Sequence, residues 1–254
     1  MSDHTRRPLH DRRALVVGGS TGIGRGIADA WSAAGANVMV CSRTRPTGPR
    51  AAMLTWQRMD LTDVDATRQL LASIAAGSLH AVCFSAIYYG DRRALFSEVA
   101  EWEWRRQVDV NLHGLWLTLS ATLRALRQAD PGLFISVSSE VVYNGGPGRS
   151  GYAATKAAAA SLLRSVADEE DDNQVRFVQV MPSGMVDSPG IRRRRPAGVN
   201  YESYMRPEHF ADLATELALT AGAGYHGESL VVNSDGRWSS VRDEVPASQS
   251  SVRA

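Results

Sequence analysis

Short apolar runs alternate with amphipathic stretches along most of the chain, and this alternation indicates the fold. The apolar runs contain few polar residues, which is typical of strands buried on both faces of a parallel sheet. Seven strands are predicted, at 14–19, 37–42, 53–59, 81–87, 133–139, 175–181 and 228–234. Helices are predicted at 22–35, 63–76, 101–129, 152–170 and from the sequence RPEHFADLATEL near residue 206. We therefore expect an α/β protein with a doubly wound, parallel seven-stranded sheet flanked by helices.

The same pattern contains no internal repeat and no linker, so we expect a single domain over residues 12–239. Residues 1–11 are polar and are predicted to be a flexible N-terminus. Residues 240–254, rich in Ser, Val and charge, are predicted to be a disordered tail. An irregular stretch rich in Pro, Gly and Arg, about 183–206, separates the last two predicted strands.

Composition and charge exclude several classes of protein. The formal net charge of +1 indicates no polyanionic partner. The chain starts without the apolar segment of a signal peptide, and no stretch reaches the roughly 20 apolar residues of a membrane helix. A cytoplasmic protein with no membrane partner is expected. Cys41 and Cys83 lie in apolar runs and are interpreted as reduced core cysteines. The histidines lack metal-ligand spacing, so no metal site is expected.

A glycine-rich turn, VGGSTGIG at 17–24, joins the first predicted strand to the first helix. Its glycines would let the backbone turn tightly and approach a pyrophosphate, and the helix N-terminus would supply amide donors. The turn therefore predicts a dinucleotide site. Its cofactor-binding residues are Gly18, Ser20, Thr21, Gly22, Ile23 and Gly24.

The end of the second strand indicates which dinucleotide is bound. An acidic residue there would bind the ribose of NAD, but the chain has Ser42 and Arg43 instead. A guanidinium can bind the 2′-phosphate of NADP bidentately. NADPH/NADP+ is therefore the expected cofactor, and the alternative is that Arg43 is a solvated surface arginine.

Lys156 is the only lysine among the 28 basic residues. It follows Tyr152 by four residues on a predicted helix, so the two side chains share one face. An ammonium beside a tyrosine favours the phenolate and lowers its pKa toward the working range. The planar fork of arginine would not reproduce this geometry, which explains why one lysine is kept. The alternative is a single lysine that survives by chance.

Two polar residues extend this pair. Ser139 ends the fifth predicted strand, at the carboxyl edge where open α/β sheets bind their ligands. Its hydroxyl could bond a substrate carbonyl beside Tyr152. Asn111 lies among apolar residues in the predicted helix 101–129, where asparagine is usually exposed or capping.

Together, VGGSTGIG, VNLHG, SVSS and the sequence from Tyr152 to Lys156 resemble the short-chain dehydrogenase/reductase family. The resemblance runs from about residue 12 to about 237. It implies a Rossmann-type fold with strand order 3-2-1-4-5-6-7, which would keep Cys41 and Cys83 beyond disulfide reach. It also implies that Ser139 orients the carbonyl and that Tyr152 is the acid or base. Lys156 would bind the nicotinamide ribose, and Asn111 would hold a water that links Lys156 to solvent.

The resemblance implies further cofactor contacts after the third, fourth and sixth strands. They are Asp60, Leu61, Ser85, Ala86, Met185, Val186 and Ser188. The chain departs from the family where Phe84-Ser85-Ala86-Ile87 replaces Asn-Asn-Ala-Gly, and where Thr21 replaces a basic residue of many NADP-dependent members. The expectation of NADP therefore depends mainly on Arg43.

The implied activity is the NADPH-dependent reduction of a ketone of a small or medium-sized molecule. Oxidation of an alcohol, reduction of a β-ketoacyl thioester and non-catalytic NADP sensing are the alternatives. The expected substrate pocket comprises Tyr88, Tyr89, Ser139, Glu140 and Tyr143, below a lid at about 188–206. The family also implies a homotetramer or homodimer, paired through the helices at 101–129 and 152–170.

The run from Arg192 to Arg195 is the strongest charge feature of this lid. It is interpreted as a solvated stretch or as a contact with an acidic substrate, carrier protein or coenzyme A. Nucleic acid is not expected, because four basic residues in a neutral protein give a small electrostatic footprint. The acidic run 168–172 would repel an acidic carrier, so a free small ketone or alcohol is preferred.

Overall fold

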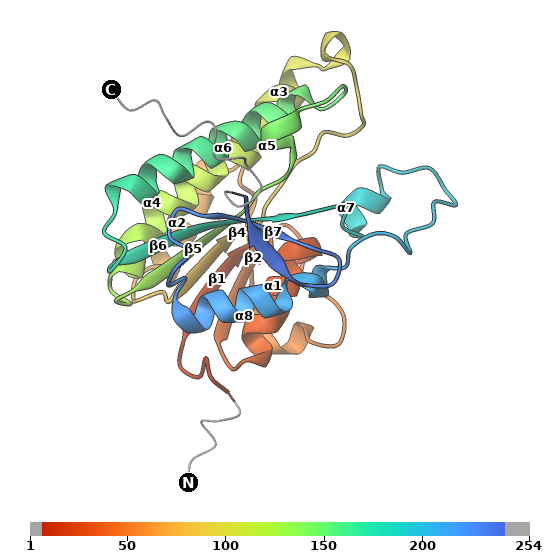
Figure 1. Cartoon of the computed structure of the whole chain (residues 1–254). Coiled ribbons are helices and arrows are strands. Elements are labelled where there is room, and N and C mark those ends of the chain that lie inside the picture. The colour runs from red at the N-terminus through yellow and green to blue at the C-terminus, as the bar shows by residue number, and fades with distance from the viewer. Residues whose placement is uncertain (1–6, 242–254) are drawn as a thin grey trace, which may run out of the picture.

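An eight-stranded sheet forms the centre of the chain, which the computed structural model describes from residue 7 to residue 241 (Figure 1). The strand order is β3-β2-β1-β4-β5-β6-β7-β8. The strands are β1 (Arg13–Val17), β2 (Asn37–Ser42), β3 (Thr55–Arg58), β4 (Ala81–Phe84), β5 (Gly132–Val137), β6 (Val175–Pro182), β7 (Ser229–Val232) and β8 (Trp238–Ser240). All neighbours are parallel except β7 and β8. The predicted α/β, doubly wound sheet is confirmed.

The number of strands was predicted wrongly, because β8 adds an antiparallel strand to the expected seven. It is three residues long and pairs Trp238 with Val232 and Ser240 with Leu230. A strand this short has no apolar run of its own, so its pairing depends on the neighbouring β7. The predicted tail lies outside the described residues from 242 on.

Two layers of helices cover the sheet (Figure 1). Helices α1 (Gly22–Ala33) and α8 (Ala211–Thr220) cover one face, and α2 (Val64–Ile74), α4 (Gly114–Arg127) and α6 (Ser150–Glu169) cover the other. Strand β1 shows why its sequence is apolar throughout. Ala14 and Val16 pack toward α1 and α8, whereas Leu15 and Val17 pack toward the other layer.

The predicted helix 101–129 is interrupted. It consists of α3 (Glu101–Val108), a π-helical turn η4 (Asp109–His113) and α4. A π-turn inserts one extra residue into a helix and often marks a functional site. Here it contains Asn111, which is 1% exposed.

Several short helices lie in the connections. They are η2 (Ala51–Met53), η3 (Phe96–Glu98), α5 (Val141–Asn144), α7 (Pro189–Arg192) and η5 (Pro207–Phe210). The connection from β2 to β3 contains only η2, as its Pro-rich and Gly-rich sequence predicts.

Of the N-terminal residues predicted to be flexible, 1–6 lie outside the described residues. Residues 7–11 form a turn, in which Leu9 is 2% exposed and donates its amide to the carbonyl of Ala34. Across residues 7–241, no helix has both the length and the apolar character to cross a membrane. The same residues contain no cluster of three or more His, Cys, Asp and Glu side chains fit to hold a metal ion.

Candidate active site

The predicted site residues follow the carboxyl ends of six parallel strands, β1 to β6. This edge is where open α/β sheets bind their ligands, because the strand ends, the following loops and the helix N-termini meet there. The residues divide into a cofactor side after β1 to β4 and a substrate side after β4 to β6.

The backbone of the turn after β1 lies close to the backbone of the loop that follows β4. Gly18 has φ of 86°, and a Cβ at this position would lie 2.4 Å from the backbone nitrogen of Ala86. Thr21 is the N-cap of α1, and no side chain among the described residues caps it. The first turn of α1 also contains no acidic residue. Its amide groups therefore fit an anionic pyrophosphate.

The loop after β4 forms the floor of this turn. The Ser85 amide donates to the carbonyl of Val17 at 2.8 Å, and a Cβ at Gly24 would lie 2.7 Å from the Cβ of Ser85. Gly24 and Ile23 begin α1 against this loop. Phe84, the first residue at which the chain departs from the family sequence, does not face the glycine-rich turn. It is 1% exposed and lies in the core beneath α4. The change therefore adds an apolar core residue and leaves two small residues, Ser85 and Ala86, at the turn.

The end of β2 places Arg43 at the surface and Ser42 inside. The Ser42 hydroxyl donates to the carbonyl of Thr44 at 2.8 Å and accepts from the indole of Trp56 at 3.1 Å. Thr44 in turn donates to the Ser20 hydroxyl at 3.4 Å. The exposed Arg43 therefore stands beside a contact between the β2 loop and the glycine-rich turn, while Ser42 holds that loop in shape.

Asp60, after β3, lies in the field of Arg43. Burial raises its pKa, but hydrogen bonds from Thr62 and the positive charges of Arg43 and Arg106 lower it below the ordinary value overall. Thr62 donates its amide at 3.1 Å and its hydroxyl at 2.8 Å to the same carboxylate oxygen. The neighbouring Leu61 is 6% exposed and packs beside Gly114. Asp60 is therefore a charged group at the cofactor edge.

On the substrate side, Ser139 and Tyr152 are brought together. Ser139 is close enough to Tyr152 for its hydroxyl to lower the pKa of that phenol, and the Ser139 hydroxyl donates to Glu140 Oε2 at 2.7 Å. Glu140 also pairs with Arg149 Nη1 at 3.3 Å. Ser139, Glu140 and Arg149 thus form a chain of polar contacts beside Tyr152.

The environment of Tyr152 keeps its phenol protonated. Burial raises its pKa most, and Tyr89 and Glu140 also raise it, whereas the hydroxyl of Ser139 and the charge of Arg149 lower it. Arg149 was not predicted as a site residue. It is the N-cap of α6, with a backbone that is not helical, so helical spacing to Tyr152 could not indicate it.

Lys156 is buried, at 7% exposure, and donates from Nζ to the carbonyl of Val137 at 2.6 Å. Burial lowers its pKa to about 8. In this arrangement Arg149 is the nearby cation that lowers the pKa of Tyr152, and Lys156 interacts with the end of β5. The helical spacing of Tyr152 and Lys156 therefore predicts where their backbones lie, but it does not predict the direction of the lysine side chain.

Asn111 uses its side chain to connect two elements. Its amide oxygen accepts from the backbone of Tyr88 at 2.8 Å, and its nitrogen donates to the Tyr88 carbonyl and the Thr155 hydroxyl, both at 3.0 Å. The π-turn therefore holds the loop after β4 against α6, on which Tyr152 and Lys156 lie.

The three tyrosines predicted for the pocket have different surroundings. Tyr89 packs on Tyr152 with ring centroids 4.9 Å apart. Tyr88 points toward α3, where its hydroxyl donates to Asp91 at 2.8 Å and Arg106 lies 5.0 Å from its ring centroid. Tyr143 is 55% exposed on α5. Of the three, only Tyr89 is brought into contact with Tyr152 by these interactions.

The predicted lid is anchored at its two ends. Val186 forms a bridge with Met205, and the Met205 amide donates to the carbonyl of Met185 at 2.8 Å. Ser188 caps α7 by accepting from the amide of Ile191 at 3.3 Å, and it lies beside Gly22. In Figure 1, α7 and the loop after it extend from the body of the molecule, at the right.

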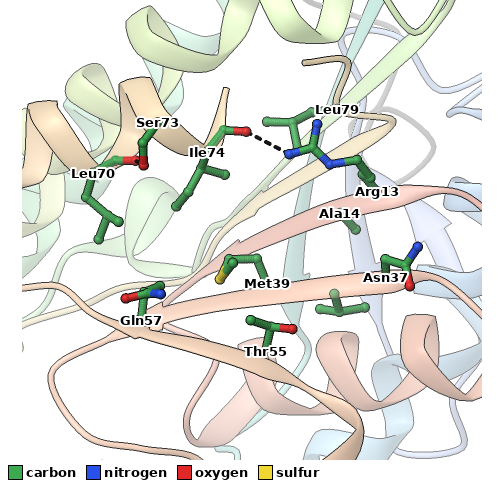
Figure 2. Close-up of a pocket in the computed structure, with 11 residues that line it drawn as sticks. Arg13, Ala14, Asn37, Met39, Thr55, Gln57, Leu70, Ser73, Ile74 and Leu79 are labelled. Carbon is green, nitrogen blue, oxygen red and sulfur yellow. Dashed lines mark hydrogen bonds between the residues drawn. The ribbon is translucent and has the colours of Figure 1, made fainter. Parts of the chain in front are cut away.

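A separate hollow of about 300 Å³ lies at the opposite edge of the sheet (Figure 2). It is lined by the first residues of β1, β2 and β3 and by one side of α2: Arg13, Ala14, Asn37, Val38, Met39, Thr55, Gln57, Leu70, Ser73, Ile74 and Leu79. The Arg13 guanidinium there donates to the carbonyls of Ile74 at 2.9 Å and Ser78 at 3.1 Å. These hydrogen bonds hold the guanidinium against the end of α2, and none of the predicted site residues lines the hollow, so we do not regard it as the active site.

Both cysteines are free and buried, on strands that flank β1. Burial raises the pKa of Cys41 to about 12 and also raises that of Cys83. Neither thiol is therefore a reactive thiolate at neutral pH.

Comparisons with known proteins agree with this arrangement. The model of the short chain dehydrogenase family matches residues 12–197. A 3-oxoacyl-(acyl-carrier-protein) reductase of Chlamydia muridarum is 28% identical over 243 residues, covering 89% of this chain and 97% of that protein. A cis-4-hydroxycyclohexanecarboxylate dehydrogenase of Sinomonas cyclohexanicum is 30% identical over 250 residues, covering 91% and 98%.

A solved structure gives the same result at the level of the fold. The NADP-bound 3-oxoacyl (acyl-carrier-protein) reductase of Agrobacterium tumefaciens C58 superposes with a TM-score of 0.77 at 26% identity, covering 92% of this chain and 97% of that one. The range matched by the family model, residues 12–197, contains the glycine-rich turn, Ser139, Tyr152 and Lys156. The chain is thus an oxidoreductase that belongs to the short-chain dehydrogenase family.

Proposed function

We propose that the chain is an NADPH-dependent oxidoreductase that reduces a ketone of a small or medium-sized molecule to a secondary alcohol. The observation that carries this proposal is that Ser139 and Tyr152 lie side by side at the sheet edge that also holds the glycine-rich turn. A carbonyl oxygen bound there would meet two hydroxyl groups, one to orient it and one to protonate it.

The residues of the site divide the work of this reaction. The nicotinamide, when bound, supplies the hydride that reduces the carbonyl carbon. Tyr152 holds a proton at its hydroxyl, because burial raises its pKa, and gives that proton to the carbonyl oxygen. Ser139 turns its hydroxyl from Glu140 to the same oxygen. The half-exposed carboxylate of Glu140 then offers the hydroxyl pair a route for protons to and from solvent.

Lys156 has two roles in this proposal. Its ammonium would bind the nicotinamide ribose, as in the family, after leaving the carbonyl of Val137. With a pKa of about 8, it can also exchange a proton near neutral pH. Asn111 acts by position, because it fixes the loop that carries Tyr89 to the helix that carries Tyr152.

The preference for NADPH over NADH is supported by charge at the end of β2. Arg43 is exposed there, beside Thr44 and Ser20, and no carboxylate precedes it on β2. A guanidinium binds a phosphate bidentately, whereas a carboxylate would repel it. The NADP bound to the structural relative supports the same preference.

Two relatives of the chain are named for different kinds of substrate. One relative acts on a free alcohol of a six-membered ring and the other on a carrier-bound oxoacyl group. We favour the free ketone or alcohol, because the relative with the higher identity of these two is named for a free alcohol. The acidic residues 168–172 lie at the end of α6 remote from Tyr152, so they do not oppose a carrier at the site. Reduction of a β-ketoacyl thioester is the second candidate, supported by the reductase relatives.

The test is NADPH consumption with a panel of cyclic ketones, aromatic ketones and β-keto thioesters, using Tyr152→Phe as the control. Turnover of one group that disappears in the variant supports the reductase and identifies its substrate class. Binding of NADPH without turnover of any ketone would contradict the proposal in favour of a cofactor sensor.

We also propose that the chain forms a homodimer or homotetramer through α4 and α6. Trp116 on α4 is 47% exposed and stacks with His113, with ring centroids 5.8 Å apart, so a large apolar side chain faces outward on this helix. Light scattering should give at least twice the chain mass of 27.5 kDa. A mass of one chain at all concentrations would contradict this.

A further inference from the structure

One of the four lid arginines differs from its neighbours in where it lies. Arg192 pairs with Asp187 through two bonds and covers the ring of Tyr201 at 4.7 Å. Arg193 is exposed. Arg194 instead lies over the ring of Tyr89, with its guanidinium carbon 5.1 Å from the ring centroid. The lid therefore directs one charge of the run toward the active site.

The contact of Arg194 brings it close to the reacting residue. The rings of Tyr89 and Tyr152 are 4.9 Å apart, so the guanidinium lies within about 10 Å of the Tyr152 ring centre, the sum of the two separations. Tyr152 is also among the groups whose charge acts on Arg194. A substrate whose carbonyl meets Tyr152 would extend toward this guanidinium if it is the size of a small ring.

The charge on Arg194 is not neutralised within the site. Arg149, the other cation here, pairs with Glu140 at 3.3 Å. No carboxylate of residues 7–241 forms an ion pair with Arg194, whose Nε is buried without a hydrogen-bond partner. Arg93 and Arg195 add positive charge nearby. An uncompensated, half-buried guanidinium is costly unless a ligand supplies the missing anion.

We infer that Arg194 binds a carboxylate of the substrate, so that the enzyme selects ketones or alcohols that carry a free acid group. This inference rests on the proposed function. A carboxylate fits best because the guanidinium fork matches it bidentately. Tyr89 lies between the two anchor points and sets the distance between the carboxylate and the reacting carbon.

The experiment compares 4-oxocyclohexanecarboxylate with its methyl ester in the NADPH-loaded enzyme. The ester keeps the ketone and the ring but lacks the charge. We expect the wild type to prefer the acid, and Arg194→Gln to lower the acid-to-ester ratio of kcat/KM by about 10- to 100-fold, mainly through the KM of the acid. Arg194→Lys should recover part of the loss, because it restores charge without the fork.

Arg193→Gln is the matched control, since it removes the same charge from an exposed position of the same run. It should leave the ratio within about twofold, as expected for a surface charge. An unchanged ratio in Arg194→Gln, or equal losses in both variants, would overturn the inference. So would a loss of NADPH affinity in Arg194→Gln, because the arginine would then serve the cofactor phosphates.

Binding separates failure of this inference from failure of the proposed function. Quenching of NADPH fluorescence by 4-oxocyclohexanecarboxylate reports binding without turnover. Quenching in the wild type that is lost in Arg194→Gln, with no turnover of any ketone, would contradict the reductase and leave the carboxylate site supported. Turnover of acid and ester at equal kcat/KM would support the reductase and overturn the carboxylate site.

Discussion

The cofactor side and the substrate side of the site are built from different materials. The cofactor side consists of regular strand ends and a turn in which a Cβ at Gly18 would collide with the backbone of Ala86. The substrate side consists of the loop after β4, the short helix α5 and the lid, and its contacts are made by Tyr89, Arg149 and Arg194. Backbone shape defines the first side, and long side chains define the second.

This difference explains what each side can tolerate. A site made by backbone permits almost no change of residue at its turns, because the chain itself would have to move. A site made by arginine and tyrosine side chains can change its ligand by changing one of them. Tyr152 lies where the two sides meet, packed on Tyr89 and beside Ser139.

The largest effect on activity is expected at that junction. Tyr152→Phe removes the proton donor but keeps the ring in its contact with Tyr89, so kcat for the best ketone should fall by about 10²- to 10⁴-fold. Thermal unfolding and NADPH affinity should change little. A rate within tenfold of the wild type would show that another group donates the proton.

A pair of glycine variants tests the contrast directly. Gly18 and Gly198 have nearly the same φ, 86° and 83°, but a Cβ at Gly198 would meet nothing within 4 Å. The backbone penalty of about 1–2 kcal/mol is therefore common to both alanine variants. Gly18→Ala adds a collision with the backbone of Ser85 and Ala86, just after β4, so it should lose about 2–5 kcal/mol of unfolding free energy and most NADPH binding.

Urea unfolding and NADPH titration of the two glycine variants provide the measurement. Equal destabilisation by Gly18→Ala and Gly198→Ala would mean that the turn after β1 can relax. The distinction between a rigid and a tolerant side would then fail.

Lys156 gives a pH-dependent test. Its folded pKa of about 8 lies below the ordinary value of 10.5, so between these pH values the unfolded chain keeps a proton that the folded chain releases. Raising the pH through this window therefore stabilises the folded wild type relative to Lys156→Met, by up to about 3 kcal/mol. The burial cost of the ammonium is fully present below pH 8.

The measurement is urea unfolding of both proteins at several pH values between 7 and 10.5. Other titrating groups are common to the two proteins and cancel in the difference. Parallel pH curves for the wild type and Lys156→Met would show that Lys156 titrates normally and is not desolvated.

The smallest effect is expected at the surface of the cofactor side. Arg43→Asp should weaken NADPH binding relative to NADH by about tenfold or more, because it replaces attraction to the 2′-phosphate by repulsion. Arg50→Asp makes the same change of charge at an exposed position of the same connection and should leave this preference nearly unchanged. Similar changes in the preference for NADPH over NADH in both variants would show that Arg43 acts only through the overall charge of this surface and does not bind the 2′-phosphate directly.

The two sides also differ in how well their residues follow from the sequence. Strand periodicity and the carboxyl-edge rule were enough to place Gly18 and Ser139 at one edge of the sheet, whereas Asp60 came from the family resemblance. These positions depend on the backbone, which follows local patterns. The position of β8 could not be predicted from the sequence, because three residues are too few to show the alternation of a strand.

Side-chain direction was harder to predict than backbone position. Helical spacing placed Lys156 beside Tyr152, yet its Nζ bonds the carbonyl of Val137, because a buried ammonium takes the nearest strong acceptor. Arg149 lies just before α6, where helical spacing to Tyr152 does not apply. Arg194 could not be predicted either, since nothing local distinguishes it from Arg193. Its contact with Tyr89 joins a loop after β6 to a loop after β4.

The bridge between Val186 and Met205 holds the two ends of the intervening segment together, so this segment can be replaced as a unit. Its ends are held together by the body of the protein, so the entropy of closing the loop grows only by about 0.6 kcal/mol for each doubling of its length. Insertions and deletions between the two anchors would therefore cost little folding stability. Evolution, or an engineer, could replace this segment to change the substrate while keeping the sheet, the glycine-rich turn and Tyr152 intact.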